Sequence, residues 1–143
     1  MTPPPGSLIL HATTVAQAGR GLVILGPSGS GKSGLALQLM ALGAGLVADD
    51  RTILSRREDR LVATCPPAIR GRIEARGVGI LATRAICEAD ICLAVDLGVA
   101  ETDRLPPLRH VEWLGVPIAL VHRQQSPHFP AAILHYLAGG RIA

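Results

Sequence analysis

One segment of the sequence combines three distinct local patterns; it runs from Leu22 to Leu39 and reads LVILGPSGSGKSGLALQL. A run of aliphatic residues is followed by glycines and serines, and then by a helix-forming sequence. The aliphatic run predicts a buried strand over 22–25. Leucines at 35, 39 and 42 predict a helix from Lys32 to about Leu42 with one apolar face. The segment therefore predicts a strand, a tight loop and a helix in direct succession.

The predicted loop fits the pattern G-x-x-x-x-G-K-[ST] of the phosphate-binding P-loop, through Gly26, Pro27, Ser28, Gly29, Ser30, Gly31, Lys32 and Ser33. Glycines let successive backbone N–H groups turn toward one anion, and the positive end of the helix points at the same place. Lys32, the only lysine in the chain, supplies a compact charge for the β- and γ-phosphates. The Ser33 hydroxyl is placed to bind Mg²⁺. The pattern predicts nucleoside triphosphate binding and leaves the acceptor open.

Two acids, Asp49 and Asp50, end the next predicted strand, which spans 46–50 and reads LVADD. A strand-terminal acid in a P-loop protein commonly holds Mg²⁺ or takes a proton from the attacking group. Because neighbouring residues of a strand point to opposite faces, one of the two acids can face the phosphates and the other a neighbour. Taken without the P-loop, the same residues would be read as an acidic turn.

The remaining pattern indicates a mixed, β-rich α/β fold in a single domain over 1–143, because predicted strands outnumber helices and do not alternate with them. The segment 68–81 has no clear assignment. The other predicted elements are a strand over 7–16 that pairs with 22–25 through a turn at 18–21, a hairpin of 52–54 and 61–64 around a charged turn at 55–60, strands at 91–97 and 117–121, and a helix at 130–137.

Composition excludes several classes of protein. The net charge is only +3, there is no run of basic residues, and aromatic residues make up 2% of the chain, which argues against nucleic-acid binding. Cys65, Cys87 and Cys92 lack metal-type spacing and are expected to be free thiols in a reducing compartment. The N-terminus has no signal-peptide pattern, and no apolar stretch is long enough to span a membrane. We expect a cytoplasmic protein.

Four motifs, in order, resemble the catalytic domain of bacterial HPr kinase/phosphorylase. They are a histidine before the P-loop (His11), GPSGSGKS (26–33), LVADD (46–50) and EARGVGIL (74–81). The P-loop alone is generic, whereas LVADD and EARGVGI together are specific to that family. The resemblance covers about residues 8–121 and is closest in kind to short alphaproteobacterial forms without the family's N-terminal domain. It implies a P-loop kinase fold related to phosphoenolpyruvate carboxykinase.

The resemblance also implies an ATP- and Mg²⁺-dependent protein serine kinase acting on an HPr-like phosphocarrier of the sugar phosphotransferase system. On this basis Asp50 would accept the proton of the serine hydroxyl, assisted by Asp49 and oriented by His11. The other implied roles are phosphate binding by Lys32, Mg²⁺ binding by Ser33, Asp50 and Glu74, and neutralisation by Arg76 of charge on the transferred group.

The chain departs from the family pattern in one segment, and two other functions stay open. Full-length family members carry a PGRN-type segment tied to the reverse, phosphate-dependent reaction. This chain lacks the segment, which counts against that reaction and leaves the formation of a homo-oligomer open. An ATP-binding regulatory module with little catalysis is a second interpretation. A GTPase or a small-molecule kinase is a third interpretation. The guanine-specifying N-K-x-D pattern would need a lysine other than Lys32, and a small-molecule kinase would usually need more chain for a lid and an acceptor site.

Overall fold

Two parallel neighbours, β3 (Arg20–Leu25) and β9 (Glu88–Ala100), form the centre of the sheet in the computed structural model, which describes residues 3–143. The elements in chain order are β1 (Ser7–Leu10), β2 (Thr13–Gln17), β3 (Arg20–Leu25), α1 (Lys32–Ala41), β4 (Gly45–Ala48), β5 (Thr52–Arg57), β6 (Arg60–Thr64), the 3₁₀ turn η1 (Pro67–Ile69), β7 (Arg72–Ala75), β8 (Gly79–Ala82), β9 (Glu88–Ala100), β10 (Arg109–Trp113), β11 (Val116–Arg123) and α2 (Phe129–Gly139).

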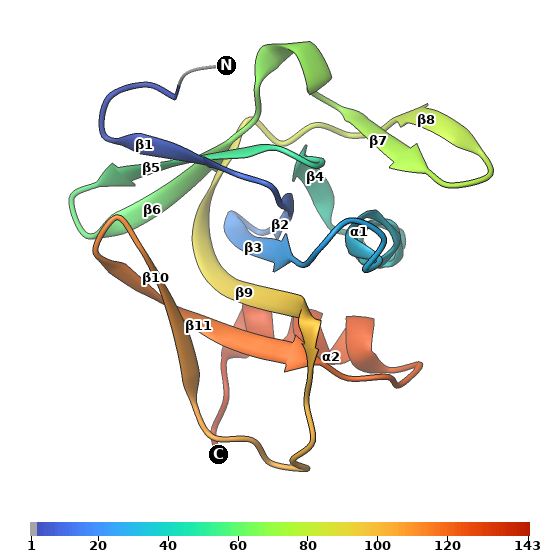
Figure 1. Ribbon diagram of the computed structural model, residues 1–143, viewed down its shortest axis with the longest axis vertical. Helices are drawn as coiled ribbons and strands as arrows, with labels where there is room; N and C mark the ends of the chain where they lie inside the picture. The colour runs from blue at the N-terminus through green and yellow to red at the C-terminus, as the bar shows by residue number, and fades with distance from the viewer. Residues whose placement is uncertain (1–2) are drawn as a thin grey trace.

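The main sheet has nine strands in the order β1-β5-β6-β9-β3-β2-β4, with β11 also pairing to β9 and β10 to β11. The long strand β9, yellow in Figure 1, curves through the middle of the molecule. One edge of β9 pairs with β3, and it also pairs with β6 near its start and with β11 further along. The β3–β9 and β9–β11 pairs are parallel and the other pairs are antiparallel.

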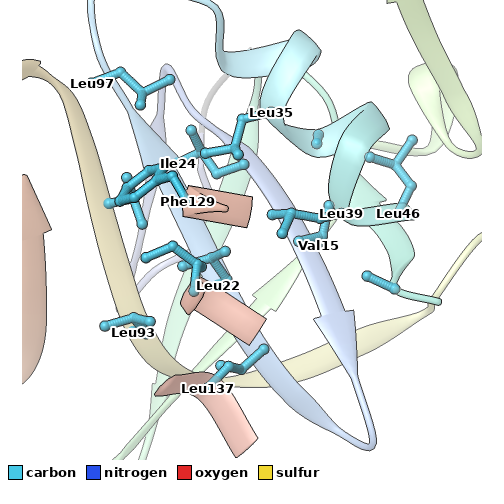
Figure 2. Close-up of a cluster of buried hydrophobic side chains, with 14 of the residues drawn as sticks. Val15, Leu22, Ile24, Leu35, Leu39, Leu46, Leu93, Leu97, Phe129 and Leu137 are labelled. Atoms are coloured by element: carbon cyan, nitrogen blue, oxygen red, sulfur yellow. The ribbon is translucent and has the colours of Figure 1, made fainter. Parts of the chain in front are cut away.

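Alternation along the central strands divides the core into two clusters. Leu22 and Ile24 of β3 lie in the cluster beneath the helices, while Val23 between them lies in the cluster on the opposite face. This follows from the two-residue period of a strand. Figure 2 shows the first cluster, in which Leu35 of α1 and Phe129 of α2 lie over the same strands. The packing fixes the start of α1 against the end of β3, which is where the P-loop lies.

The strand-rich α/β architecture predicted from the sequence is confirmed. The hairpin of β2 and β3 turns at Ala18 and Gly19, and the hairpin of β5 and β6 turns at 58–59, so its strands extend into the segment predicted as turn. Helix α1 begins at Lys32, as predicted, and ends at Ala41. The strand predicted at 91–97 lies within β9, and the predicted C-terminal helix is α2.

The single strand predicted over 7–16 is wrong. The chain bends at His11 and Ala12, so that β1 pairs with β5 whereas β2 pairs with β3 and β4. His11 is therefore not in mid-strand but at the bend between two strands with different partners. The strand predicted over 46–50 also stops earlier, since β4 ends at Ala48 and the two acids follow it.

Two regions contain strands that were not predicted from the sequence. The segment 68–81 contains part of η1, strand β7 and most of β8, with Gly71 and Gly77 at positive φ angles of 72° and 83° where the chain turns. Strand β10 was missed and pairs with β11 across a turn at Leu114 and Gly115. The β7–β8 hairpin is a separate two-stranded sheet that lies beside α1 (Figure 1).

All three cysteines are free, as predicted. Cys65 is partly buried, and this burial raises the pKa of its thiol. Cys87 is exposed, and its sulfur accepts a hydrogen bond of 2.6 Å from Nη2 of Arg70. Within residues 3–143, neither helix has the length and apolar character needed to cross a membrane.

Candidate active site

The P-loop connects the end of β3 to the first residue of α1. Gly26, Gly29 and Gly31 all have positive φ angles, of 148°, 83° and 98°, which side-chain-bearing residues rarely adopt. A Cβ atom at Gly26 would also collide with the Ser30 side chain. Gly31 is the N-cap residue of α1, so the loop delivers the chain directly into the helix. The helix thus begins with its free backbone N–H groups at the loop, as an anion site requires.

Lys32 lies across this loop. Its side chain is buried, and Nζ donates hydrogen bonds to the backbone oxygens of Gly26 at 2.7 Å and Pro27 at 3.2 Å. These contacts hold the ammonium group over the loop that the glycines shape. A buried positive charge next to free N–H groups favours a bound polyanion, and phosphate groups meet that requirement.

Asp49 ties the loop helix to two other elements. It is buried, and its Oδ1 accepts hydrogen bonds from Oγ of Ser33 at 2.8 Å and from Oγ1 of Thr13 at 2.9 Å. Its Oδ2 accepts a bond of 3.1 Å from the backbone N–H of Glu74. One carboxylate therefore joins α1, β2 and β7, and it fixes the orientation of the Ser33 hydroxyl.

Asp50, unlike Asp49, is exposed. Its φ angle is 70°, in the left-handed region that Asp and Asn adopt more readily than most residues. Its Oδ1 lies 2.6 Å from Nε2 of His11, and both side chains are more than half exposed. Its backbone N–H donates to Oγ1 of Thr13 at 3.4 Å. The bend at His11 described above is what brings the imidazole to this carboxylate.

A cavity of about 560 Å³ collects most of the predicted site residues. Besides P-loop residues, its walls include His11, Asp50, Glu74 and Arg76. Asp49 does not line the cavity; it lies behind Ser33 and contacts the site through that hydroxyl. Gly26, Pro27 and Ser30 are on the loop but not on this wall. The cavity therefore combines a cationic P-loop with carboxylates that could receive a proton or a metal ion.

Thr13 is the site residue that sequence reasoning missed. It lines the cavity, and its hydroxyl donates to the Asp49 carboxylate while accepting from the Asp50 backbone, so it connects the two acids. The only signal in the sequence was a pair of hydroxyl residues, Thr13 and Thr14, inside an otherwise apolar strand. Buried hydroxyl groups normally have hydrogen-bond partners, so the pair pointed to polar neighbours without saying which.

The predicted metal residues share this cavity without forming a closed cage. Ser33, Asp50 and Glu74 all line it, and Glu74 is exposed. Over residues 3–143, no three His, Cys, Asp or Glu side chains come together as a metal-binding group. Mg²⁺ commonly takes one or two carboxylates and completes its shell with water and substrate phosphates, so an open arrangement of this kind suits it.

Replacing Asp49 with alanine should destabilise the fold. Without the carboxylate, the backbone N–H of Glu74 and the hydroxyls of Thr13 and Ser33 lose their hydrogen-bond acceptor. We therefore expect the free energy of unfolding to fall by about 1–3 kcal/mol. Urea denaturation followed by circular dichroism measures it. In Asp49→Asn the amide can accept from the N–H and donate to hydroxyls that rotate, so this variant should lose much less. An alanine variant as stable as the wild type would show that the three bonds contribute little.

Comparisons with known proteins agree on one relationship. The family model for the HPr Serine kinase C-terminal domain matches residues 6–94. The HPr kinase/phosphorylase of Aromatoleum aromaticum is 40% identical over 148 residues, which cover 94% of this chain and 44% of that protein. The HPr kinase/phosphorylase of Cupriavidus necator is 34% identical over 137 residues, covering 87% and 42%. The chain spans less than half the length of these two relatives.

A solved structure has the same fold. The structure of the Hpr(Ser) kinase/phosphatase from Coxiella burnetii superposes with a TM-score of 0.78, covering 94% of this chain and 91% of that one, at 24% sequence identity. At this identity the match speaks to architecture only. It agrees with the β-rich P-loop arrangement described above.

Proposed function

Because the chain belongs to the HPr serine kinase C-terminal domain family, we propose that it transfers the γ-phosphoryl group of ATP to a serine of an HPr-like phosphocarrier. One observation carries the proposal. Lys32, Ser33 and Asp50 line one cavity, and Asp49 lies behind it and accepts a hydrogen bond from the Ser33 hydroxyl. We place the activity in the cytoplasm, where ATP and phosphocarrier proteins are available.

The proposed chemistry assigns each group a separate task. The loop N–H groups and Lys32 hold the phosphates and keep the γ-phosphoryl group in place. Asp50 accepts the proton of the serine hydroxyl as the oxygen attacks in line with the leaving phosphate. His11 orients the Asp50 carboxylate through the 2.6 Å contact. Arg76, on the cavity wall, offsets negative charge on the group in transfer.

Mg²⁺ is part of this proposal because the donor atoms suit it. The Ser33 hydroxyl donates its proton to Asp49, which leaves its lone pairs available for a cation. Asp50 and Glu74 add carboxylate oxygens on the same cavity wall. A bound Mg²⁺ would supply neutralisation of phosphate charge. Ser33, Asp50 and Glu74 are the residues proposed to hold it, with Asp49 orienting the serine.

Incubation with labelled ATP, Mg²⁺ and HPr from the same organism tests the function. The expected result is label on an HPr serine, identified by phosphoamino-acid analysis and peptide mapping. If ATP binds but no label reaches HPr, the chain acts as an ATP-binding regulatory module and the kinase proposal is wrong. An HPr variant with the labelled serine changed to alanine is the control and should take up none.

Replacing His11 with alanine should lower kcat by about two- to fivefold, because a charged contact between exposed side chains contributes about 0.5–1 kcal/mol and each 1.4 kcal/mol is a factor of ten. KM for ATP should stay within about twofold, since the imidazole contacts Asp50 and not the loop. Steady-state kinetics with HPr separates the two constants. His135→Ala, exposed on α2 and outside this cavity, is the matched control. An unchanged kcat in His11→Ala would remove the orienting role.

A further inference from the structure

A second cavity, of about 370 Å³, adjoins the first at the start of α1. One wall comes from the P-loop and the first turns of α1, through Ser30, Leu35 and Gln38. The opposite wall is the segment 123–130, which runs from the last residue of β11 through the connecting loop to the first two residues of α2, and Leu97 of β9 also lines the cavity. Of the residues that line the two cavities, only Gly31 and Gly34 are common to both. The cavities therefore meet at these two glycines.

The direction of a bound triphosphate follows from the proposed function, on which this inference rests. The γ-phosphoryl group must lie toward Asp50, in the first cavity, and Lys32 reaches the β- and γ-phosphates. The α-phosphate then lies toward the other side of the loop, where the chain passes Gly31 and Gly34. The space beside Gly34 is open, since a Cβ built there has no atom within 4 Å. A ligand can pass from one cavity to the other at this point.

The walls of the second cavity suit a flat, partly polar group joined to a polyanion. Leu35, Leu97 and Phe129 provide apolar surface, and Gln38 and Gln124 provide amides that can both donate and accept. No aspartate or glutamate lines it among the described residues 3–143, so nothing there repels an anion.

Two buried polar atoms belong to residues of this same cavity and have no hydrogen-bond partner in the described part of the chain. They are Oγ of Ser30 and Nε of Arg123. A buried polar group without a partner costs free energy, and such groups are uncommon in folded proteins. Their coincidence at one cavity next to a P-loop indicates a ligand site.

We propose that the second cavity takes the nucleoside end of the triphosphate, with the base between α1 and the segment 123–130. The P-loop then separates two halves of one substrate. Phosphoryl chemistry takes place on the side of Asp50, and recognition of the nucleoside takes place on the side of Gln38. This assigns a function to the segment after β11, which no motif in the sequence singled out.

Binding of ATP and of inorganic tripolyphosphate, compared by calorimetry, tests the proposal. In the wild type, ATP should bind at least about tenfold more tightly than tripolyphosphate. Gln38→Trp fills the cavity from an exposed helix position and should weaken ATP binding at least about tenfold, leaving tripolyphosphate binding within about twofold. Ala41→Trp, exposed on the same helix and outside both cavities, should change neither. Equal affinities in the wild type, or equal effects of Gln38→Trp on both ligands, would overturn the proposal.

Photolabelling of the wild-type protein with 8-azido-ATP gives a result that does not depend on how a variant folds. Trypsin cleaves after Arg123 and Arg141, so one peptide, 124–141, carries most of the wall opposite α1. The label should appear on this peptide and be displaced by ATP but not by tripolyphosphate. Label confined to the β7–β8 hairpin would contradict the assignment. Neither readout requires phosphoryl transfer, so a failure of HPr phosphorylation with these results intact would reject the kinase proposal alone.

Discussion

Asp50→Asn is expected to lower kcat for HPr phosphorylation by about 10²–10⁴-fold, the range that a general base contributes. Asn keeps the size and hydrogen-bonding shape of the side chain, and it tolerates the positive φ of 70° at this position. It can still pair with His11, but its amide cannot take up the serine proton. ATP binding, measured separately by calorimetry, should change by less than about threefold because the P-loop contacts are intact.

A matched control for this variant is Asp59→Asn, at the turn between β5 and β6. Asp59 is exposed and lines no part of the cavity, so kcat should be unaffected. If Asp50→Asn retains more than about a tenth of the wild-type kcat, Asp50 is not the proton acceptor, and Glu74 on the same wall becomes the group to examine.

Lys32→Met should abolish detectable transfer at ordinary ATP concentrations. Methionine keeps the unbranched stem but removes the charge that bonds to the Gly26 and Pro27 oxygens and that would contact the phosphates. Loss of one preorganised charged donor costs about 10²–10³-fold in rate, and here ATP affinity should fall as well. Stability should hold, because the change removes a buried charge that has no ion-pair partner among the described residues 3–143.

Lys32→Arg separates charge from shape at this position. A guanidinium group keeps the charge, but it is planar and larger than an ammonium, so it should not restore activity in a loop this tight. Kinetics and thermal unfolding of both variants provide the comparison. Full activity in Lys32→Arg would mean that charge alone is needed, and a large fall in melting temperature in Lys32→Met would mean that the lysine is mainly structural.

Local signals were enough to predict the parts of the fold that are close in sequence. The strand, P-loop and helix over 22–42 and the two hairpins follow from hydrophobic period and turn residues within a few positions. The break at His11 could not be predicted this way, because it exists only since β1 and β2 pair with strands that come later in the chain. The same holds for β9, whose length reflects its pairing with three strands.

In the candidate site, too, local motifs could be predicted and contacts between distant segments could not. The P-loop pattern predicted that Lys32 and Ser33 lie at the start of a helix after a tight loop. Asp49 and Asp50 do face different partners, but strand alternation is not the reason, because both follow the end of β4 and Asp50 has a φ angle of 70°. The sequence pattern alone did not predict which residues the two carboxylates contact. Asp49 contacts Ser33 and Asp50 contacts His11 because β2 pairs with both β3 and β4, which brings the ends of three strands together at the cavity. Thr13 acquires its role from the same pairing.

The stereochemistry of transfer shows whether the serine oxygen attacks ATP held by the P-loop directly, with Asp50 accepting a proton and never the phosphoryl group. The measurement uses ATP whose γ-thiophosphate is made chiral by an oxygen-18 label on one non-bridging oxygen, and it determines the configuration of the thiophosphoryl group on HPr. A single in-line displacement predicts inversion. Retention would require two successive displacements through a phosphorylated enzyme group, such as Asp50 or His11, and would contradict the account.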